Sequence, residues 1–117
     1  MASKKKVASN AKKVKATGIA DAVFCIVNRG FTDLVMVAAR KVGVTGGTVL
    51  HARGTGSSKF KNFYGISVTP EKEIVVMIVK SDLTEKVLLA VNEAAGLDTQ
   101  GQGIAFALPV TDYVGTR

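Results

Sequence analysis

The sequence has few of the residue types that form catalytic and metal centres. It contains one cysteine and one histidine among 117 residues, which excludes an internal disulfide framework and a zinc site built from several cysteines. Its nine acidic residues are scattered and form no recognisable acid/base pair. The apolar runs are much shorter than the roughly 18 to 20 residues that a membrane-spanning helix needs. We therefore expect neither an enzyme nor a membrane-spanning protein, and a reduced cysteine fits the cytoplasm best.

The lone cysteine and the lone histidine are weak catalytic candidates. Cys25 falls inside a short apolar run, where a thiol behaves as a small buried hydrophobic group. His51 precedes Arg53 by two residues on an expected strand, so the two side chains share one face, and no carboxylate is close to His51 in the sequence. We expect His51 to be structural or to contact a ligand. No catalytic residue and no metal site are assigned.

Acidic residues are absent from residues 1–17, whose six lysines account for most of the formal net charge of +7. Residues 18–117 are nearly balanced, with ten basic and nine acidic side chains. We therefore divide the chain into a basic N-terminal arm, residues 1–17, that is too polar to fold alone, and a single domain at residues 18–117. Because the arm has no aromatic side chain that could stack on a base, we expect no specific recognition of nucleic acid.

Two similar halves, displaced by 52 positions, follow Gly18. Each half opens with a short apolar run rich in β-branched residues, which is typical of a buried strand. A helical pattern and a second strand follow each run. The expected elements are strands at 22–27, 48–53, 74–79 and 104–110 and helices at 32–42 and 83–94. This order predicts an α+β, ferredoxin-like βαββαβ fold, a four-stranded antiparallel sheet with both helices on one face.

Local patterns refine the two helices. In the first one, Leu34, Ala38 and Val42 form an apolar stripe at helical spacing, which we expect to face the sheet. Before the second one, Ser81 and Asp82 are expected to cap the helix N-terminus, as polar side chains of this kind commonly do.

The expected strands at 22–27, 74–79 and 104–108 are apolar at successive positions, so both faces of the sheet would be apolar. Two helices can cover only one face. The other face would expose a larger apolar patch than a soluble monomer usually does, and further copies of the chain are the simplest cover. We expect an obligate homo-oligomer.

Residues 54–70 connect two expected strands and are too numerous for a hairpin turn. Loops of this length in a small domain usually serve a function. Three of the seven aromatic side chains of the protein lie here, Phe60, Phe63 and Tyr64. We expect these rings to contact a partner protein, with an extended hairpin or a loop of no function as the alternative.

Glycine clusters stand beside the expected strand ends. They are Gly46-Gly47, Gly54-Thr-Gly56 and Gly101-Gln-Gly103. Glycine lets main-chain amides approach an anion closely, which is how many phosphate sites are built. None of the clusters matches a P-loop, and taken alone each is explained better by turn formation than by ligand binding.

The order of these clusters resembles a known family. Gly43-Val-Thr-Gly-Gly-Thr-Val49, Gly54-Thr-Gly56, Pro70-Glu-Lys-Glu-Ile-Val-Val76 and Gly101-Gln-Gly103-Ile-Ala-Phe106 look like successive landmarks of the PII signal-transduction proteins (nitrogen regulatory protein P-II) over residues 19–117. The resemblance implies a homotrimer of ferredoxin-like subunits whose sheets face inward. It also implies that an adenine nucleotide such as ATP, ADP or AMP binds in clefts between subunits, with no required cofactor, and that the long loop controls a transporter or a metabolic enzyme.

The resemblance assigns roles to individual residues. The predicted ligand-binding residues are Thr48, Gly54, Gly56, Ser58, Gly101, Gly103 and Arg117. By position, the first three would lie at the base of the long loop, Gly101 and Gly103 in a second loop that contacts phosphates, and Arg117 near the phosphates at the C-terminus. Ser58 stands where well-studied members have a glutamine that helps to hold a metal ion and 2-oxoglutarate.

The chain departs from the family pattern at two cation positions. Ile104 and Gly115 stand where the family has a lysine and an arginine that bind phosphates, and the long loop is several residues shorter. We therefore expect a divergent PII-like regulator. The alternative is a trimeric metal-binding or metal-tolerance protein resembling CutA, which shares the fold. Its site would combine three His51 side chains around a threefold axis.

Overall fold

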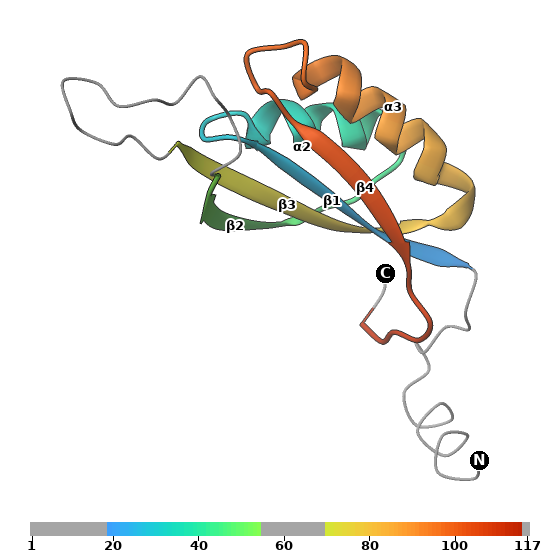
Figure 1. Ribbon diagram of the computed structural model, residues 1–117. Helices are drawn as coiled ribbons and strands as arrows, with labels where there is room; N and C mark the ends of the chain where they lie inside the picture. The colour runs from blue at the N-terminus through green and yellow to red at the C-terminus, as the bar shows by residue number, and fades with distance from the viewer. Residues whose placement is uncertain (1–18, 55–69, 116–117) are drawn as a thin grey trace, which may run out of the picture.

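The computed structural model describes residues 19–54 and 70–115. Their elements in chain order are β1 (Ala20–Asn28), α2 (Thr32–Lys41), β2 (Thr48–Arg53), β3 (Glu71–Lys80), the short 3-10 helix η1 (Ser81–Leu83), α3 (Thr84–Ala95) and β4 (Ile104–Pro109). The strands form one antiparallel sheet, and both helices pack on one face of it (Figure 1). This arrangement confirms the predicted α+β, ferredoxin-like fold. The basic arm and most of the long loop lie outside the described residues.

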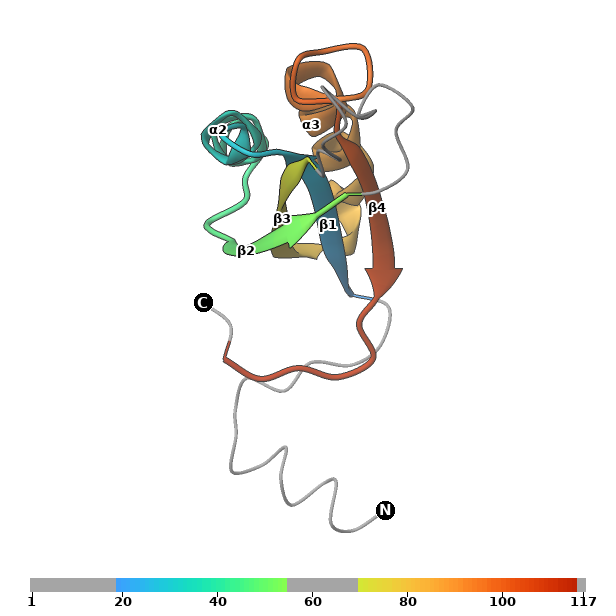
Figure 2. The same cartoon turned by 60° about the vertical axis from the view of Figure 1, so that its left-hand side comes forward.

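The strand order β2-β3-β1-β4 places the two longest strands, β3 and β1, at the centre of the sheet. β1 and β3 pair along their length, from Ala20 opposite Lys80 to Asn28 opposite Lys72. The shorter strands β2 and β4 form the edges (Figure 2). Neither helix is long and apolar enough to cross a membrane, within the parts of the chain that the structure describes.

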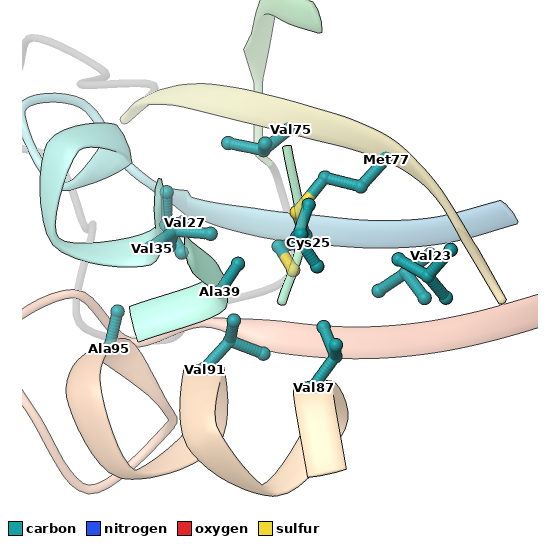
Figure 3. Packing of buried hydrophobic residues seen from close by; sticks show 12 residues of the cluster. Val23, Cys25, Val27, Val35, Ala39, Val75, Met77, Val87, Val91 and Ala95 are labelled. Carbon is teal, nitrogen blue, oxygen red and sulfur yellow. The ribbon is translucent and has the colours of Figure 1, made fainter. Parts of the chain in front are cut away.

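The core lies between the sheet and the helices (Figure 3). Alternate residues of β1 and β3 point into it, because side chains of a strand alternate between the two faces of a sheet. The buried side chains come from β1, β3, α2 and α3, and they are Val23, Cys25, Val27, Val75, Met77, Val79, Val35, Ala39, Val87, Val91 and Ala95. Most are small or β-branched, so the two helices can approach the sheet closely.

The predicted stripe of α2 is displaced by one residue. Val35 and Ala39 are buried against the sheet, whereas Leu34 is 48% exposed. Ala38 and Val42 pack only at the margin of the core. Residues 34–39 are all apolar, so periodicity alone cannot select which stripe of this helix faces the sheet.

The predicted N-cap of the second helix is also wrong. Ser81 and Asp82 form part of η1, and no side chain caps α3, which begins at Thr84. Thr84 Oγ1 instead donates a hydrogen bond to Asp21 Oδ2 on β1, at 2.6 Å. The polar side chain at the start of α3 therefore ties the helix to the sheet.

The face of the sheet opposite the helices is mostly apolar, with Thr48 as a polar residue at its β2 edge. Cross-strand pairing aligns three rows across the strands, Leu50-Ile74-Ile26-Ile104, Val76-Phe24-Phe106 and Ile78-Ala22-Leu108. Phe24 and Phe106 stack with their ring centroids 5.2 Å apart. Five large side chains of this open face are about half exposed, namely Leu50, Ile78, Ile104, Phe106 and Leu108. The expectation of a sheet with two apolar faces is confirmed.

Candidate functional site

The candidate site lies at the end of the sheet where β1 and β2 end and where β3 and β4 begin. Antiparallel pairing brings these four chain ends together. The neck of the long loop, formed by Gly54 and Pro70, and the turn at residues 96–103 before β4 both emerge here (Figure 1). Gly54 and the Gly101-Gln-Gly103 cluster are thus brought to one end of the domain.

Gly54 lies at the base of the long loop, as predicted. Its N–H donates a hydrogen bond to the Pro70 carbonyl at 3.0 Å, which closes the neck. A Cβ atom at this position would lie 2.8 Å from Cε of Lys72. The lysine side chain therefore passes directly beside the main chain of Gly54 and would have to shift if this residue carried a Cβ atom.

Thr48 is not at the base of the long loop, and this part of the prediction is wrong. It is the first residue of β2 and pairs with Val76, so it lies on the open face of the sheet and is exposed. With a rise of about 3.3 Å per residue, roughly 20 Å of strand separate it from Gly54. The contact of Thr48 with a ligand stays a prediction.

In the turn at residues 96–103, glycine allows close packing. A Cβ atom on Gly103 would lie 2.4 Å from the Ala95 carbonyl oxygen, and one on Gly101 would lie 3.0 Å from Cβ of the same alanine. Gln102 between them has a φ of +46°, the one positive φ of a non-glycine residue in the described chain. Backbone in this region is uncommon and is held by its surroundings.

The main-chain amides of this turn already donate hydrogen bonds within the domain. The Gly103 N–H donates to the Ala95 carbonyl at 2.7 Å, the Gln102 N–H to the Thr99 carbonyl at 3.1 Å, and the Gly101 N–H to Thr99 Oγ1 at 3.1 Å. An anion that accepted hydrogen bonds from these amides would have to replace these partners. The ligand contacts of Gly101 and Gly103 stay predictions.

A polar cluster at the start of β3 was missed by the sequence analysis. Glu73 is 8% exposed and accepts a hydrogen bond from the Gly30 N–H at 2.9 Å. Its other oxygen lies 3.4 Å from His51 Nδ1 on β2. No carboxylate is close to His51 in the sequence, but strand register places a glutamate directly opposite it. Only knowledge of that register would have revealed the pair.

An ion pair between Arg29 and Glu71 lies at the same end of β3. Arg29 and Glu71 are joined by a charge-assisted hydrogen bond, and both side chains are more than half exposed. The hydrogen bond from Arg29 lowers the pKa of Glu71 below its ordinary value and raises that of Arg29. Solvent screens such exposed pairs strongly, so they contribute little to stability.

Asn28 and Lys72 link the neck of the long loop to the turn at residues 96–103. Lys72 Nζ donates to Asn28 Oδ1 at 2.6 Å, and Asn28 Nδ2 donates to the Gln100 carbonyl at 2.8 Å. Neither residue was singled out by the sequence, because the partners are 44 and 72 positions apart.

Cys25 lies in the core of the domain and not at this site. Cys25 is buried, and burial raises the pKa of its thiol to about 11, which keeps it protonated and unreactive near neutral pH. The described residues contain no group of three or more His, Cys, Asp or Glu side chains arranged to hold a metal ion. Six predicted site residues lie outside the described ranges, namely Gly56, Ser58, Phe60, Phe63, Tyr64 and Arg117.

Comparison with known proteins agrees with this geometry. A sequence model of the family described as nitrogen regulatory protein P-II matches residues 20–117. The chain belongs to the P-II family. Among solved structures, it is similar to that of Arabidopsis thaliana PII bound to citrate, with 29% identity over 79% of this chain and 75% of that one and a TM-score of 0.58. A comparison with curated protein sequences found no match. The comparisons give no support to the CutA-like alternative.

Proposed function

We propose that this P-II protein assembles as a homotrimer, binds a small anion of the adenine nucleotide type between subunits and controls a partner protein through residues 54–70. Proteins of this family are regulators rather than enzymes, which supports the regulatory part of the proposal. The observation that carries the proposal is the apolar open face of the sheet, because a protein with such a face needs copies of itself to cover it.

The size of the open face supports the assembly. The ten apolar side chains of the three rows, spaced about 4.8 Å across the strands and about 6.8 Å along them, give a patch of roughly 330 Å². A contiguous apolar patch of this size often marks an interface. Burying it stabilises the assembly by up to about 8 kcal/mol per subunit, at about 25 cal/mol per Å².

The ligand site of the proposal lies at the end of the sheet that carries the neck and the turn at residues 96–103. Ile104 begins β4 at this end and belongs to the open face, so a trimer would bring a neighbouring subunit close to the turn. The Arabidopsis relative was solved with citrate, a small anion, which supports an anionic ligand here. Arg117 is the cation that the resemblance assigns to this ligand.

The regulated partner is proposed to be a transporter or a metabolic enzyme that contacts Phe60, Phe63 and Tyr64. Nitrogen regulation is the corresponding physiological role, and the cytoplasm the corresponding compartment. These assignments come from the family and from the composition of the loop. They are to be tested after the oligomeric state and the ligand.

Light scattering followed by calorimetric titration tests the proposal. We expect a trimer that binds one of ATP, ADP, AMP or citrate. In that case Arg117→Gln should weaken the binding about tenfold or more, because a hydrogen bond to a charged group contributes about 1.5 to 3 kcal/mol. Arg40→Gln, at an exposed position in the last turn of α2, is the matched control and should bind as the unchanged protein does. A monomer, or a trimer that binds none of the four compounds, would contradict the proposal.

A further inference from the structure

One side chain connects the two segments of the candidate site. Asn28, the last residue of β1, accepts a hydrogen bond from Lys72 Nζ at 2.6 Å through Oδ1. Its Nδ2 donates to the Gln100 carbonyl at 2.8 Å, and its main-chain N–H donates to the Gly101 carbonyl, also at 2.8 Å. The Asn28 side chain thus contacts the turn at residues 96–103 through its NH₂ group and the start of β3 through its oxygen.

The Lys72 side chain in turn lies against the neck of the long loop. A Cβ atom on Gly54 would lie 2.8 Å from Lys72 Cε and 3.1 Å from Cγ, so the lysine stem runs directly beside this glycine. The Gly54 N–H donates to the Pro70 carbonyl at 3.0 Å. One path from the neck to the turn at residues 96–103 therefore runs through two side chains, those of Lys72 and Asn28.

The chemistry of the two partners fixes the orientation of the Asn28 amide. An ammonium group only donates and a carbonyl group only accepts hydrogen bonds. If the amide turned over, its NH₂ group would face the Lys72 ammonium and its oxygen would face the Gln100 carbonyl. Both contacts would be repulsive. Because the Asn28 amide has only one favourable orientation, the position of the Lys72 ammonium constrains the position of the Gln100 carbonyl.

The rest of the β1 end is fixed independently of this amide. Asn28 and Lys72 are opposite each other in the β1–β3 ladder, the Arg29 N–H donates to the Glu71 carbonyl at 3.2 Å, and the Gly30 N–H donates to Glu73. Removing the Lys72 ammonium would leave these contacts in place. If removing the ammonium changes the turn at residues 96–103, the change must therefore pass through the Asn28 side chain, because the strand pairing is kept.

We propose that Asn28 is a positioning residue that couples the neck of the long loop to the turn at residues 96–103. Displacing the Lys72 ammonium at the neck frees the Asn28 amide and loosens the Gln100–Gly103 main chain. Conversely, moving the Gln100 carbonyl frees the Asn28 amide and weakens its contact with the Lys72 ammonium. The inference rests on the proposed function for its meaning, because these are the segments to which that function assigns the partner and the ligand. The coupling itself requires no ligand.

Amide hydrogen exchange, resolved by NMR in the protein without nucleotide, tests the coupling. Lys72→Met keeps the side-chain stem beside Gly54 and removes the ammonium. We expect the exchange of the Gln102 and Gly103 amides to become about fivefold faster, the factor that corresponds to about 1 kcal/mol for one hydrogen bond. Lys80→Met, at the exposed opposite end of β3, is the matched control and should leave both amides unchanged.

Asn28→Asp separates the two contacts of the amide. The aspartate keeps an acceptor for Lys72 and loses the donor to the Gln100 carbonyl, so we expect the turn amides to exchange faster in this variant. Adding Lys72→Met to it should cause no further increase, because the path is already broken. An unchanged turn in Lys72→Met, or an equal increase at core amides such as that of Val75, would overturn the coupling. Because no nucleotide is present, neither result bears on the nucleotide titration.

Discussion

Replacing Ile78 with glutamate should prevent assembly of the protein while leaving its fold intact. Ile78 lies on the central strand β3 and on the open face of the sheet, where its exposed fraction is 51%. Because the side chain already faces solvent in a single subunit, a charge there costs the isolated subunit little. In the proposed trimer the same charge would be buried against the neighbouring sheets without a partner.

The size of the effect follows from two contributions. Losing the burial of a half-exposed isoleucine removes about 1 kcal/mol per subunit, and burying an unpaired carboxylate costs several kcal/mol. Three copies together amount to roughly 10 kcal/mol or more, which lowers the assembly constant about 10⁷-fold at 1.4 kcal/mol per factor of ten. At micromolar concentration the variant should therefore be a monomer.

The assay is light scattering, with circular dichroism to verify the fold of the subunit. Leu89→Glu is the matched control, because Leu89 lies on α3 and is 64% exposed, on the layer opposite the open face. It should assemble as the unchanged protein does. A trimeric Ile78→Glu variant would refute the assignment of the interface to the open face, and so would a Leu89→Glu variant that dissociated.

Two further predictions concern packing and the buried thiol. Gly103→Ala should lower the free energy of unfolding by about 1 to 3 kcal/mol, because the new Cβ would lie 2.4 Å from the Ala95 carbonyl oxygen and 2.7 Å from Val27 Cγ1. Gly46→Ala meets no atom within 4 Å and should be neutral or slightly stabilising, which urea unfolding of both variants at equal protein concentration would verify. Cys25 should resist a thiol-specific disulfide reagent at pH 8 in the folded protein and react after unfolding. Since burial raises its folded-state pKa from 9.0 to about 11, its contribution to stability is present below about pH 9 and is lost as the pH rises through 11. A Gly46→Ala variant as unstable as Gly103→Ala, or a thiol that reacts at once, would contradict these two arguments.

The fold was predictable because both halves of the chain show the same local pattern of strand, helix and strand. The apolar runs at residues 22–27 and 74–79 became the two central strands, which hold the core on one face and the apolar rows on the other. Because apolar residues occupy successive positions in these runs, the sequence indicated that both faces of the sheet are apolar. This is a local property of the sequence, so it needs no knowledge of which strand pairs with which.

The predictions that failed depend on contacts between distant residues. His51 and Glu73 face each other because of the register of β2 on β3, and no spacing in the sequence reveals this register. The rotation of α2 is set by the sheet beneath it, since Leu34 and Val35 are both apolar and only one can be buried. The hydrogen bonds of Asn28 to Lys72 and Gln100 are likewise invisible until the strands are aligned.

Register also gives a physical meaning to the replacement at residue 104. The resemblance to the family places a phosphate-binding lysine at this position, and here it is an isoleucine. Ile104 pairs with Ile26, which pairs with Ile74, which pairs with Leu50, so the residue completes an aliphatic row across all four strands. A lysine would end that row with a charge at the edge of the open face. The isoleucine therefore extends the proposed subunit interface to the base of the proposed ligand cleft, and the proposed anion would have to be bound by other cations, of which Arg117 is the one that we propose to test.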